Sequence, residues 1–180
     1  GSAIASSSLI TELLKGKKGI IFGALDENSI AWKVALKAHE EGAKFTLTNA
    51  PIAMRMGAIK ALGETTGAEI IPADATSMED LENLFTKSQE VLGGKIDFIL
   101  HSIGMSINVR KGRPYTDLKH DDFLKAMDIS ALSLHRVLQT AYKQDAINRG
   151  GSVVALSYIA AQRIFPGYSD MADNKSALES

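Results

Sequence analysis

The 180-residue sequence contains no cysteine. Disulfide bonds, iron–sulfur clusters and thiolate metal sites are therefore excluded in this chain, and a reducing cytoplasm is the compartment we expect. Long apolar runs are also lacking, so we expect no membrane-spanning segment. The histidines lie far apart along the chain and none has the spacing of a metal ligand pair, so we expect no metal site.

An excess of charge of one sign is lacking too. The sequence has 20 Lys and Arg against 21 Asp and Glu, a formal net charge of −1. This balance argues against wholesale nucleic-acid binding. The length fits one domain. We expect residues 1–13, which lack a basic leader, to be a tag or flexible N-terminus, and residues 14–180 to form the folded domain.

Short apolar segments alternate with amphipathic ones along the chain. We expect strands at 19–23, 44–49, 69–74, 95–102 and 152–157, and helices at 29–42, 51–67, 77–93, 121–148 and from about 168 onward. Strands separated by helices indicate parallel pairing with right-handed crossovers. The predicted fold is a Rossmann-like, doubly wound parallel sheet of the three-layer α/β/α type, which binds ligands at the carboxyl ends of its strands. We therefore expect residues 14–180 to be a dinucleotide-binding domain.

The first predicted strand runs into the loop "GALDENSIAW" (23–32). Gly23 would allow close approach of a pyrophosphate, and Ser29 could serve as a helix cap or a phosphate ligand. The usual G-x-G-x-x-G is absent, so an ordinary strand-to-helix loop is an equal alternative. After the second strand no acid is present for an adenosine ribose, and Arg55 leaves NADPH open beside NADH. Asp74 could bind an adenine amine or cap the next helix.

Tyr168 and Lys175 are seven residues apart, which is close to two helical turns. On a helix they would share one face, with Met171 between them. A nearby ammonium would lower the phenol pKa from about 10 toward neutrality, making Tyr168 an acid or oxyanion partner. Tyr158 would place a second hydroxyl at the same pocket. Coincidence explains most such spacings, but the position after the fifth strand favours a catalytic site.

Several segments together resemble one family, the enoyl-[acyl-carrier-protein] reductases of bacterial fatty-acid synthesis, within the short-chain dehydrogenase/reductase superfamily. The likeness runs from about Leu14 to the last residue. The residues that carry it are "GALDENSIA" (23–31), "HSIG" (101–104), "DIS" (128–130), "LSYIAAQRIFPGY" (156–168), Met171 and Lys175. Ordinary superfamily members have an Asn-Asn-Ala-Gly-like turn where this chain has His101–Gly104, and a catalytic serine where it has Ala155. Both differences argue against the alternative function, carbonyl reduction.

The resemblance implies hydride transfer from NADH to a trans-2-enoyl thioester, with NADPH as the other possible donor. It implies that Tyr168 contacts the thioester carbonyl, that Tyr158 borders the acyl pocket, and that Lys175 binds the nicotinamide ribose. The other cofactor-binding residues that it implies are Gly23, Ser29 and Ile30 at the pyrophosphate, Asp74 and Ala75 at the adenine, and Ser102, Ile103, Gly104 and Leu156 near the nicotinamide ribose.

The resemblance also implies partners. The substrate would arrive on an acidic acyl carrier protein, for which Arg110, Lys111 and Arg113 are candidate docking charges. The intact enzyme would be a homotetramer that packs through the helices at 121–148 and 168–180. Family members continue with further strands and a substrate-covering loop, so we expect a truncated form, with an inactive nucleotide-binding fragment as the alternative. Asp173 and Asn174 stand where many relatives have small apolar residues.

Overall fold

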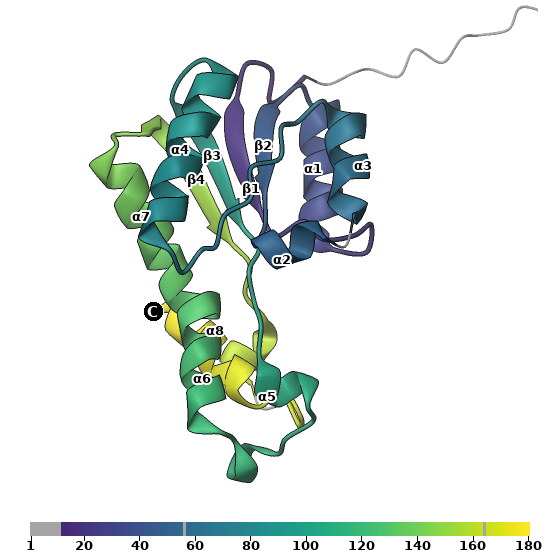
Figure 1. Ribbon diagram of the computed structural model, residues 1–180, viewed down its shortest axis with the longest axis vertical. Helices are drawn as coiled ribbons and strands as arrows, with labels where there is room; N and C mark the ends of the chain where they lie inside the picture. The colour runs from purple at the N-terminus through teal and green to yellow at the C-terminus, as the bar shows by residue number, and fades with distance from the viewer. Residues whose placement is uncertain (1–11, 56, 164) are drawn as a thin grey trace, which may run out of the picture.

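The computed structural model describes residues 12–55, 57–163 and 165–180. Four parallel strands form one sheet in the order β2-β1-β3-β4 (Figure 1). Their bounds are Lys18–Phe22 for β1, Lys44–Thr48 for β2, Ile96–His101 for β3 and Ile147–Ala155 for β4. Phe22 is in register with Thr48 on one side and with His101 on the other, so these strands end at one level. The predicted Rossmann-like fold is confirmed.

Helices follow the strands in sequence. They are α1 (Ile30–Glu40), α2 (Pro51–Met54), α3 (Ala58–Thr66), α4 (Met78–Leu92), α5 (Ile107–Arg110), α6 (His120–Met127), α7 (Ser133–Lys143) and α8 (Asp170–Glu179). A π-helical segment, Asp128–Leu132, joins α6 to α7, and short 3-10 turns lie at Tyr115–Asp117 and Ile159–Ala161. Two serine side chains cap helices: Ser29 accepts from the Trp32 amide at α1, and Ser77 accepts from the Asp80 amide at α4.

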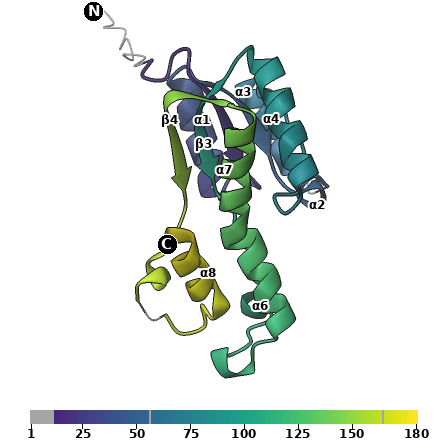
Figure 2. The same ribbon diagram turned by 90° about the vertical axis from the view of Figure 1, so that its left-hand side faces the viewer.

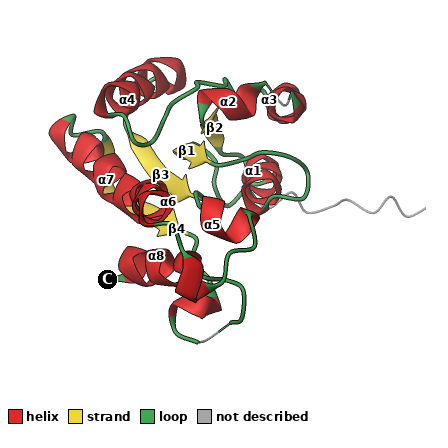
Figure 3. Ribbon diagram, turned by 60° about the horizontal axis from the view of Figure 1, so that its bottom comes forward, coloured by secondary structure: helices red, strands yellow, loops and turns green. Residues whose placement is uncertain are grey.

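The sheet lies between two helical layers (Figure 3). Successive strand residues point to opposite faces, so Ile20 packs with α4 and α7, whereas Ile21 packs with α1 and α3. Both side chains are fully buried, as are Leu84 and Leu62 of the covering helices. Continuous apolar strands of this kind are typical of a parallel sheet that is covered on both faces.

A small lobe extends beyond the carboxyl ends of the strands. It contains α5, α6, α8 and the turn at Ile159–Ala161, and it is the lower part of the molecule in Figures 1 and 2. The chain enters it twice, after β3 and after β4, and leaves it once through the π-helical segment into α7. The lobe therefore places the residues that follow β3 and β4 side by side at the ligand-binding edge of the sheet.

Some predicted boundaries were wrong. The segment 69–74 is not a regular strand but forms one isolated parallel bridge, Ile70 with Leu47. Its backbone hydrogen bonds to Leu47 and Asn49 are too few for a continuous ladder with β2. The helix expected at 51–67 is interrupted at Gly57, whose φ of 75° is left-handed. The helix expected at 121–148 ends at Lys143, and β4 begins earlier than predicted, at Ile147.

The strand β4 forms an edge of the sheet in the part of the chain that the structure describes. It pairs with β3 along Ile96–His101. Its apolar side chains are partly uncovered, and Val154 is 53% exposed. An apolar edge strand of this kind is a surface that natural proteins cover or pair.

Candidate active site

A cleft of about 600 Å³ opens where the strands of the sheet end. It is lined by residues from the loops after β1, β2 and β3 and from the lobe, including Asn49, Arg110 and Lys125. The predicted cofactor-binding residues that the structure brings together here are Gly23, Asp74, Ala75, Ser102, Ile103 and Gly104. The carboxyl edge of a doubly wound sheet is where such folds bind dinucleotides.

Gly23 joins two of the loops that line this cleft. Its φ is 91°, and a Cβ atom built at this residue would lie 1.7 Å from the carbonyl oxygen of Ser102. Its amide donates to the carbonyl oxygen of Thr48 at 3.0 Å. Only glycine permits both the left-handed backbone and the contact with the loop after β3. Gly23 thus has a structural reason to be glycine in addition to the close approach of a phosphate.

Ser29 and Ile30 are not among the residues that line the cleft. The Ser29 hydroxyl donates to the carbonyl oxygen of Asp26 at 2.8 Å and accepts from the amides of Leu25 and Trp32. It therefore fixes the loop before α1 in the role of helix cap, one of the two roles considered for it. Ile30, the first residue of α1, is 61% exposed.

Asp74 and Asn49 both line the cleft, and each stabilises a cleft loop through side-chain hydrogen bonds. Asp74 Oδ1 accepts from the amide of Thr76 at 2.9 Å and from its hydroxyl at 2.7 Å. Asn49 Nδ2 donates to the carbonyl oxygen of Ala24 at 2.9 Å, which ties the loop after β2 to the loop after β1. From the sequence, position 49 was notable only because it lacks the acid expected to bind an adenosine ribose. The structure shows that the Asn49 side-chain amide joins two loops instead.

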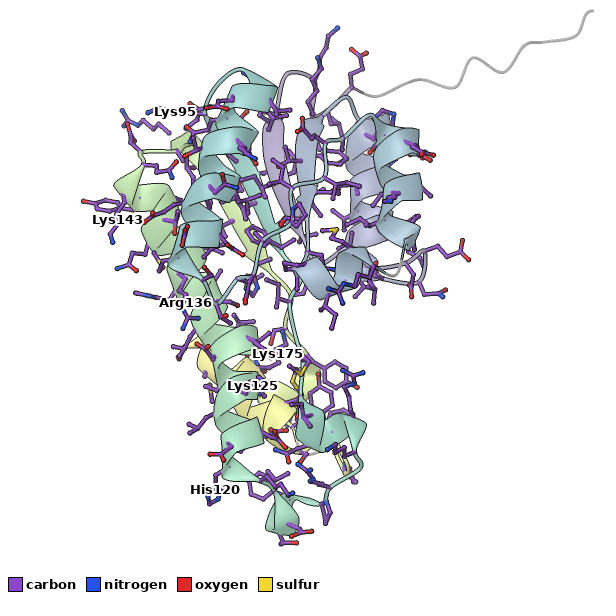
Figure 4. The ribbon with its side chains drawn as sticks, viewed as in Figure 1. Lys95, His120, Lys125, Arg136, Lys143 and Lys175 are labelled. Carbon is purple, nitrogen blue, oxygen red and sulfur yellow. The ribbon has the colours of Figure 1, made fainter. Side chains whose placement is uncertain are left out.

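Lys175 is held at the junction between the lobe and the sheet (Figure 4). Its Nζ atom donates to the carbonyl oxygens of Ile103, at 3.0 Å, and Leu156, at 2.9 Å. Burial lowers its pKa. A Cβ atom on Gly104 would come within 3.4 Å of the same nitrogen, so the ammonium adjoins the cleft wall. An ammonium group has three donors, and two are used here.

Tyr168 differs from its prediction in two respects. It precedes α8, which begins at Asp170, so it does not share a helical face with Lys175. Its pKa is raised, first by burial and then by the neighbouring Tyr158, rather than lowered by the lysine. The phenol is therefore a neutral hydrogen-bond donor at pH 7.

The Tyr168 ring forms part of an aromatic group. Its centroid lies 4.7 Å from that of Tyr158, which in turn lies 5.5 Å from that of Phe165. Tyr158 and Phe165 are both partly exposed. The two tyrosine rings thus lie side by side, but neither lines the 600 Å³ cleft, and the shared pocket expected for their hydroxyls stays a prediction.

His101, the last residue of β3, is fully buried. Its Nε2 atom lies 2.8 Å from the Ser133 hydroxyl, which donates its own hydrogen to the Ile129 carbonyl oxygen at 2.5 Å. Nε2 must therefore carry the ring hydrogen and donate it. Burial, and then Lys175, lower the pKa of His101 to about 4. In the sequence, only its place at the start of the "HSIG" motif distinguishes His101 from the other histidines.

Ser130 was not predicted individually, although it lies in the "DIS" motif. It sits in the π-helical segment, a distortion that is frequent at functional sites. Its hydroxyl oxygen accepts from the Met105 amide at 3.1 Å and lies 3.2 Å from the Met105 carbonyl oxygen. The helix α6–α7 thereby fixes the loop that follows Ser102–Gly104.

The candidate docking charges fall into different environments. Arg110 lines the cleft, and Lys111 is exposed. Arg113 Nη1 donates to Asn108 Oδ1 at 2.8 Å and pairs with Asp122 at 2.5 Å, which lowers the pKa of that carboxyl. Since its guanidinium is used inside the lobe, Arg113 is a structural residue rather than a docking charge.

Metal-binding clusters and membrane-spanning helices are both absent from residues 12–55, 57–163 and 165–180. No group of three or more histidine, aspartate or glutamate side chains there is arranged to hold a metal ion. Every helix in that part of the chain is too short or too polar to cross a membrane.

Known proteins of similar sequence point to one family. The family described as "Enoyl-(Acyl carrier protein) reductase" matches residues 23–180. The enoyl-[acyl-carrier-protein] reductase [NADH] FabI of Rickettsia bellii is 37% identical over 175 residues, which cover 95% of this chain and 64% of the relative.

Solved structures agree. The crystal structure of FabI from Alistipes finegoldii is 62% identical with a TM-score of 0.92, and the match covers 94% of this chain and 65% of that one. A FabI–NADH complex from the same organism is 62% identical with a TM-score of 0.91, covering 93% of this chain and 59% of that one. The chain thus spans about three-fifths of the length of the relatives that it matches.

The contact between Gly23 and the Ser102 carbonyl predicts a large cost for a side chain at this position. We expect Gly23→Ala to lower the free energy of unfolding by at least about 3 kcal/mol, because both backbone strain and overlap result. Gly16→Ala is the matched control: its φ of 76° is similar, but nothing lies within 4 Å, so only about 1 kcal/mol is expected. Urea unfolding measures both, and equal losses would contradict the close contact.

The depressed pKa of His101 predicts a stability that depends on pH. The folded imidazole stays neutral down to about pH 4, whereas the unfolded one takes up its proton near pH 6.5. The stabilisation is complete above pH 6.5 and is lost as the pH falls toward 4, so unfolding at pH 4.5 should cost about 2 kcal/mol less than at pH 7.5.

The variant His101→Phe keeps an apolar ring in place and should lose this part of the pH dependence. His39→Gln, a change at an exposed histidine of α1, should keep it. Urea unfolding curves at the two pH values provide the measurement. An unchanged difference in His101→Phe would show that another group is responsible.

Proposed function

The chain belongs to the enoyl-(acyl carrier protein) reductase family, and from this premise we propose that it reduces the carbon–carbon double bond of a trans-2-enoyl thioester carried by acyl carrier protein. The observation that carries the proposal is the position of Lys175, whose ammonium is fixed on the Ile103 and Leu156 carbonyls. Lys175 and Leu156 are not themselves among the cleft-lining residues, but Ile103 and the adjacent Gly104 are. The ammonium keeps one N–H free for a ligand hydroxyl.

The cleft residues fit a nicotinamide dinucleotide. Asp74 and Ala75 would meet the adenine, Gly23 the pyrophosphate, and Ser102–Gly104 the nicotinamide ribose, with Ser29 and Ile30 shaping the phosphate loop. We propose NADH as the cofactor, since the name of one relative includes NADH and the crystal structure of another is a complex with NADH. Arg55, the residue that suggested NADPH, is not among the cleft-lining residues. When bound, the cofactor would supply the hydride.

In this proposal Tyr168 stabilises the charge that develops on the thioester carbonyl oxygen during reduction. Its raised pKa keeps the hydroxyl protonated, so it can donate a hydrogen bond to an enolate oxygen without first losing its proton. Lys175 orients the nicotinamide ribose through its remaining N–H. The partly exposed rings of Tyr158 and Phe165 offer an apolar border for the acyl chain.

We also propose the homotetramer that the resemblance implied. Apolar side chains lie uncovered along the continuous rod of α6, the π-helical segment and α7, and Tyr142 is 87% exposed. They recur on this rod as Leu124, Leu132, Leu138 and Tyr142. Exposed apolar side chains that recur along one element in this way support a subunit contact there. Lys111 remains available for an acidic carrier protein, and a carrier-bound substrate fits the expected cytoplasmic location.

The cofactor proposal predicts that the 180-residue chain binds NADH and that Lys175→Met weakens binding about tenfold, because a charge-assisted hydrogen bond is lost. Lys87→Met, a change at an exposed lysine of α4, should have no effect. Calorimetric titration measures the affinities. Equal affinities in all three proteins would argue against the assigned cleft.

The reaction itself is tested with crotonyl-coenzyme A, by the loss of NADH absorbance, in the longest natural version of the protein. Tyr168→Phe should lower kcat by about 100-fold, the effect of removing one oxyanion donor. Turnover of a panel of ketones instead of the enoyl thioester would favour carbonyl reduction. Failure of both substrate classes would leave nucleotide binding alone.

The assembly proposal predicts that Leu138→Glu combined with Tyr142→Glu yields smaller particles in sedimentation equilibrium. Two charges on the exposed rod would have to be desolvated in the contact. Lys87→Glu on α4 is the control and should leave the mass unchanged. A double variant with the mass of the unmodified protein would place the subunit contact elsewhere.

A further inference from the structure

A buried carboxylate stands at the start of α8, two residues after Tyr168. Asp170 is 0% exposed. Its Oδ1 atom accepts a hydrogen bond from the Ser106 hydroxyl at 2.5 Å, and its Oδ2 atom accepts one from Asn108 Nδ2 at 2.9 Å. Both partners come from the segment that follows β3, more than 60 residues away in sequence. This contact therefore joins the segment that enters the lobe after β3 to the one that enters it after β4.

The direction of each of these hydrogen bonds is fixed by the other partners. The Ser106 oxygen already accepts from the Val109 amide, so its hydrogen points to Asp170. Asn108 Oδ1 accepts from Arg113 Nη1 at 2.8 Å and from the Lys119 amide at 3.1 Å, which leaves only the amide hydrogens of Asn108 for Asp170. Asp170 thus faces two donors, and an ionised carboxylate is the group that accepts from both.

The backbone between Tyr168 and Asp170 is strained. Ser169 has φ 56° and ψ −134°, a conformation that residues with a side chain rarely adopt. Its hydroxyl lies 3.4 Å from the Arg113 carbonyl oxygen, a long contact that cannot hold this conformation by itself. Gly167, on the other side of Tyr168, also has a positive φ of 79°. The tyrosine therefore sits between two bends, just before α8, and its carbonyl oxygen accepts from the Met171 amide at 3.2 Å in the first turn of that helix.

We propose that Asp170 is a positioning residue that holds Ser169 in its strained conformation and so sets the Tyr168 hydroxyl for catalysis, an inference that rests on the proposed function. Ser106 and Asn108 follow directly on Ser102–Gly104, which line the cofactor cleft. The Asp170 contact therefore fixes the tyrosine relative to the loop on which the nicotinamide would lie. Lys175 is fixed separately, by the carbonyl oxygens of Ile103 and Leu156.

The separate attachment of Lys175 makes the test selective. Asparagine has nearly the same shape as Asp170, but its NH₂ group would face one of the two donors, the Ser106 hydroxyl or Asn108 Nδ2. One buried hydrogen bond is therefore lost in Asp170→Asn. We expect kcat for the enoyl thioester to fall about 10- to 100-fold, the effect of a reacting group displaced by about 1 Å. The NADH dissociation constant should change less than about twofold. Asp121→Asn, a change at an exposed carboxylate of α6, is the matched control and should leave both constants unchanged.

A rescue experiment separates positioning from general stability. Glycine adopts the Ser169 conformation without the steric cost of a Cβ atom. Adding Ser169→Gly to Asp170→Asn should therefore recover kcat at least partly, although it adds no contact. The proposal would be overturned if NADH affinity, kcat and the melting temperature all fell together in Asp170→Asn and Ser169→Gly recovered none of them. Asp170 would then have a merely structural role.

A spectroscopic measurement does not depend on turnover. In protein labelled with 3-fluorotyrosine, the Tyr168 resonance is assigned through Tyr168→Phe. It should shift or broaden in Asp170→Asn, return toward its original position when Ser169→Gly is added, and be unaffected in Asp121→Asn. An unchanged Tyr168 resonance in Asp170→Asn overturns the proposal. If the unmodified protein reduces no enoyl thioester, the proposed function fails, and this resonance alone still decides whether Asp170 positions Tyr168.

Discussion

The attachment of the Lys175 ammonium to two backbone carbonyls is the interaction on which the candidate site depends. Ile103 follows β3 and Leu156 follows β4, so a single side chain from α8 joins the ends of two neighbouring strands. Burial disfavours the charged form and lowers the pKa, while the carbonyl oxygens favour the ammonium. The lobe is thereby connected to the sheet at the point where a parallel sheet binds its ligand.

The loops around this attachment are fixed without the help of a ligand. Gly23 permits the loop after β1 to touch the Ser102 carbonyl, Asn49 ties the loop after β2 to Ala24, and Ser130 holds Met105 from the π-helical segment. Each of these contacts uses a backbone group at the rim of the cleft. A cleft with walls fixed in this way has little ordering entropy left to lose on binding.

The sequence predicted the parts of the fold that local patterns determine. Alternation of apolar segments placed β1 and β3, and Ser77 marked the start of α4, because strand burial and helix capping act over a few residues. The strand predicted at 69–74 was wrong because a strand needs a continuous ladder with a neighbour, and this segment makes one bridge to β2. The helical placement of Tyr168 was wrong because the bend at Ser169 depends on distant partners of Asp170. Long-range hydrogen bonds of this kind leave no periodic signal in the sequence.

The pKa directions distinguish what the two central residues can do. Proximity of an ammonium would have made Tyr168 more acidic, yet its pKa is raised, and the Lys175 ammonium is turned toward carbonyl oxygens instead. A phenol that holds its proton tightly is suited to donate a hydrogen bond to developing negative charge, because it remains a donor throughout the neutral pH range. Its contribution then depends on where the hydroxyl is held rather than on its acidity. The backbone on either side of Tyr168 is therefore as much a part of the site as the ring itself.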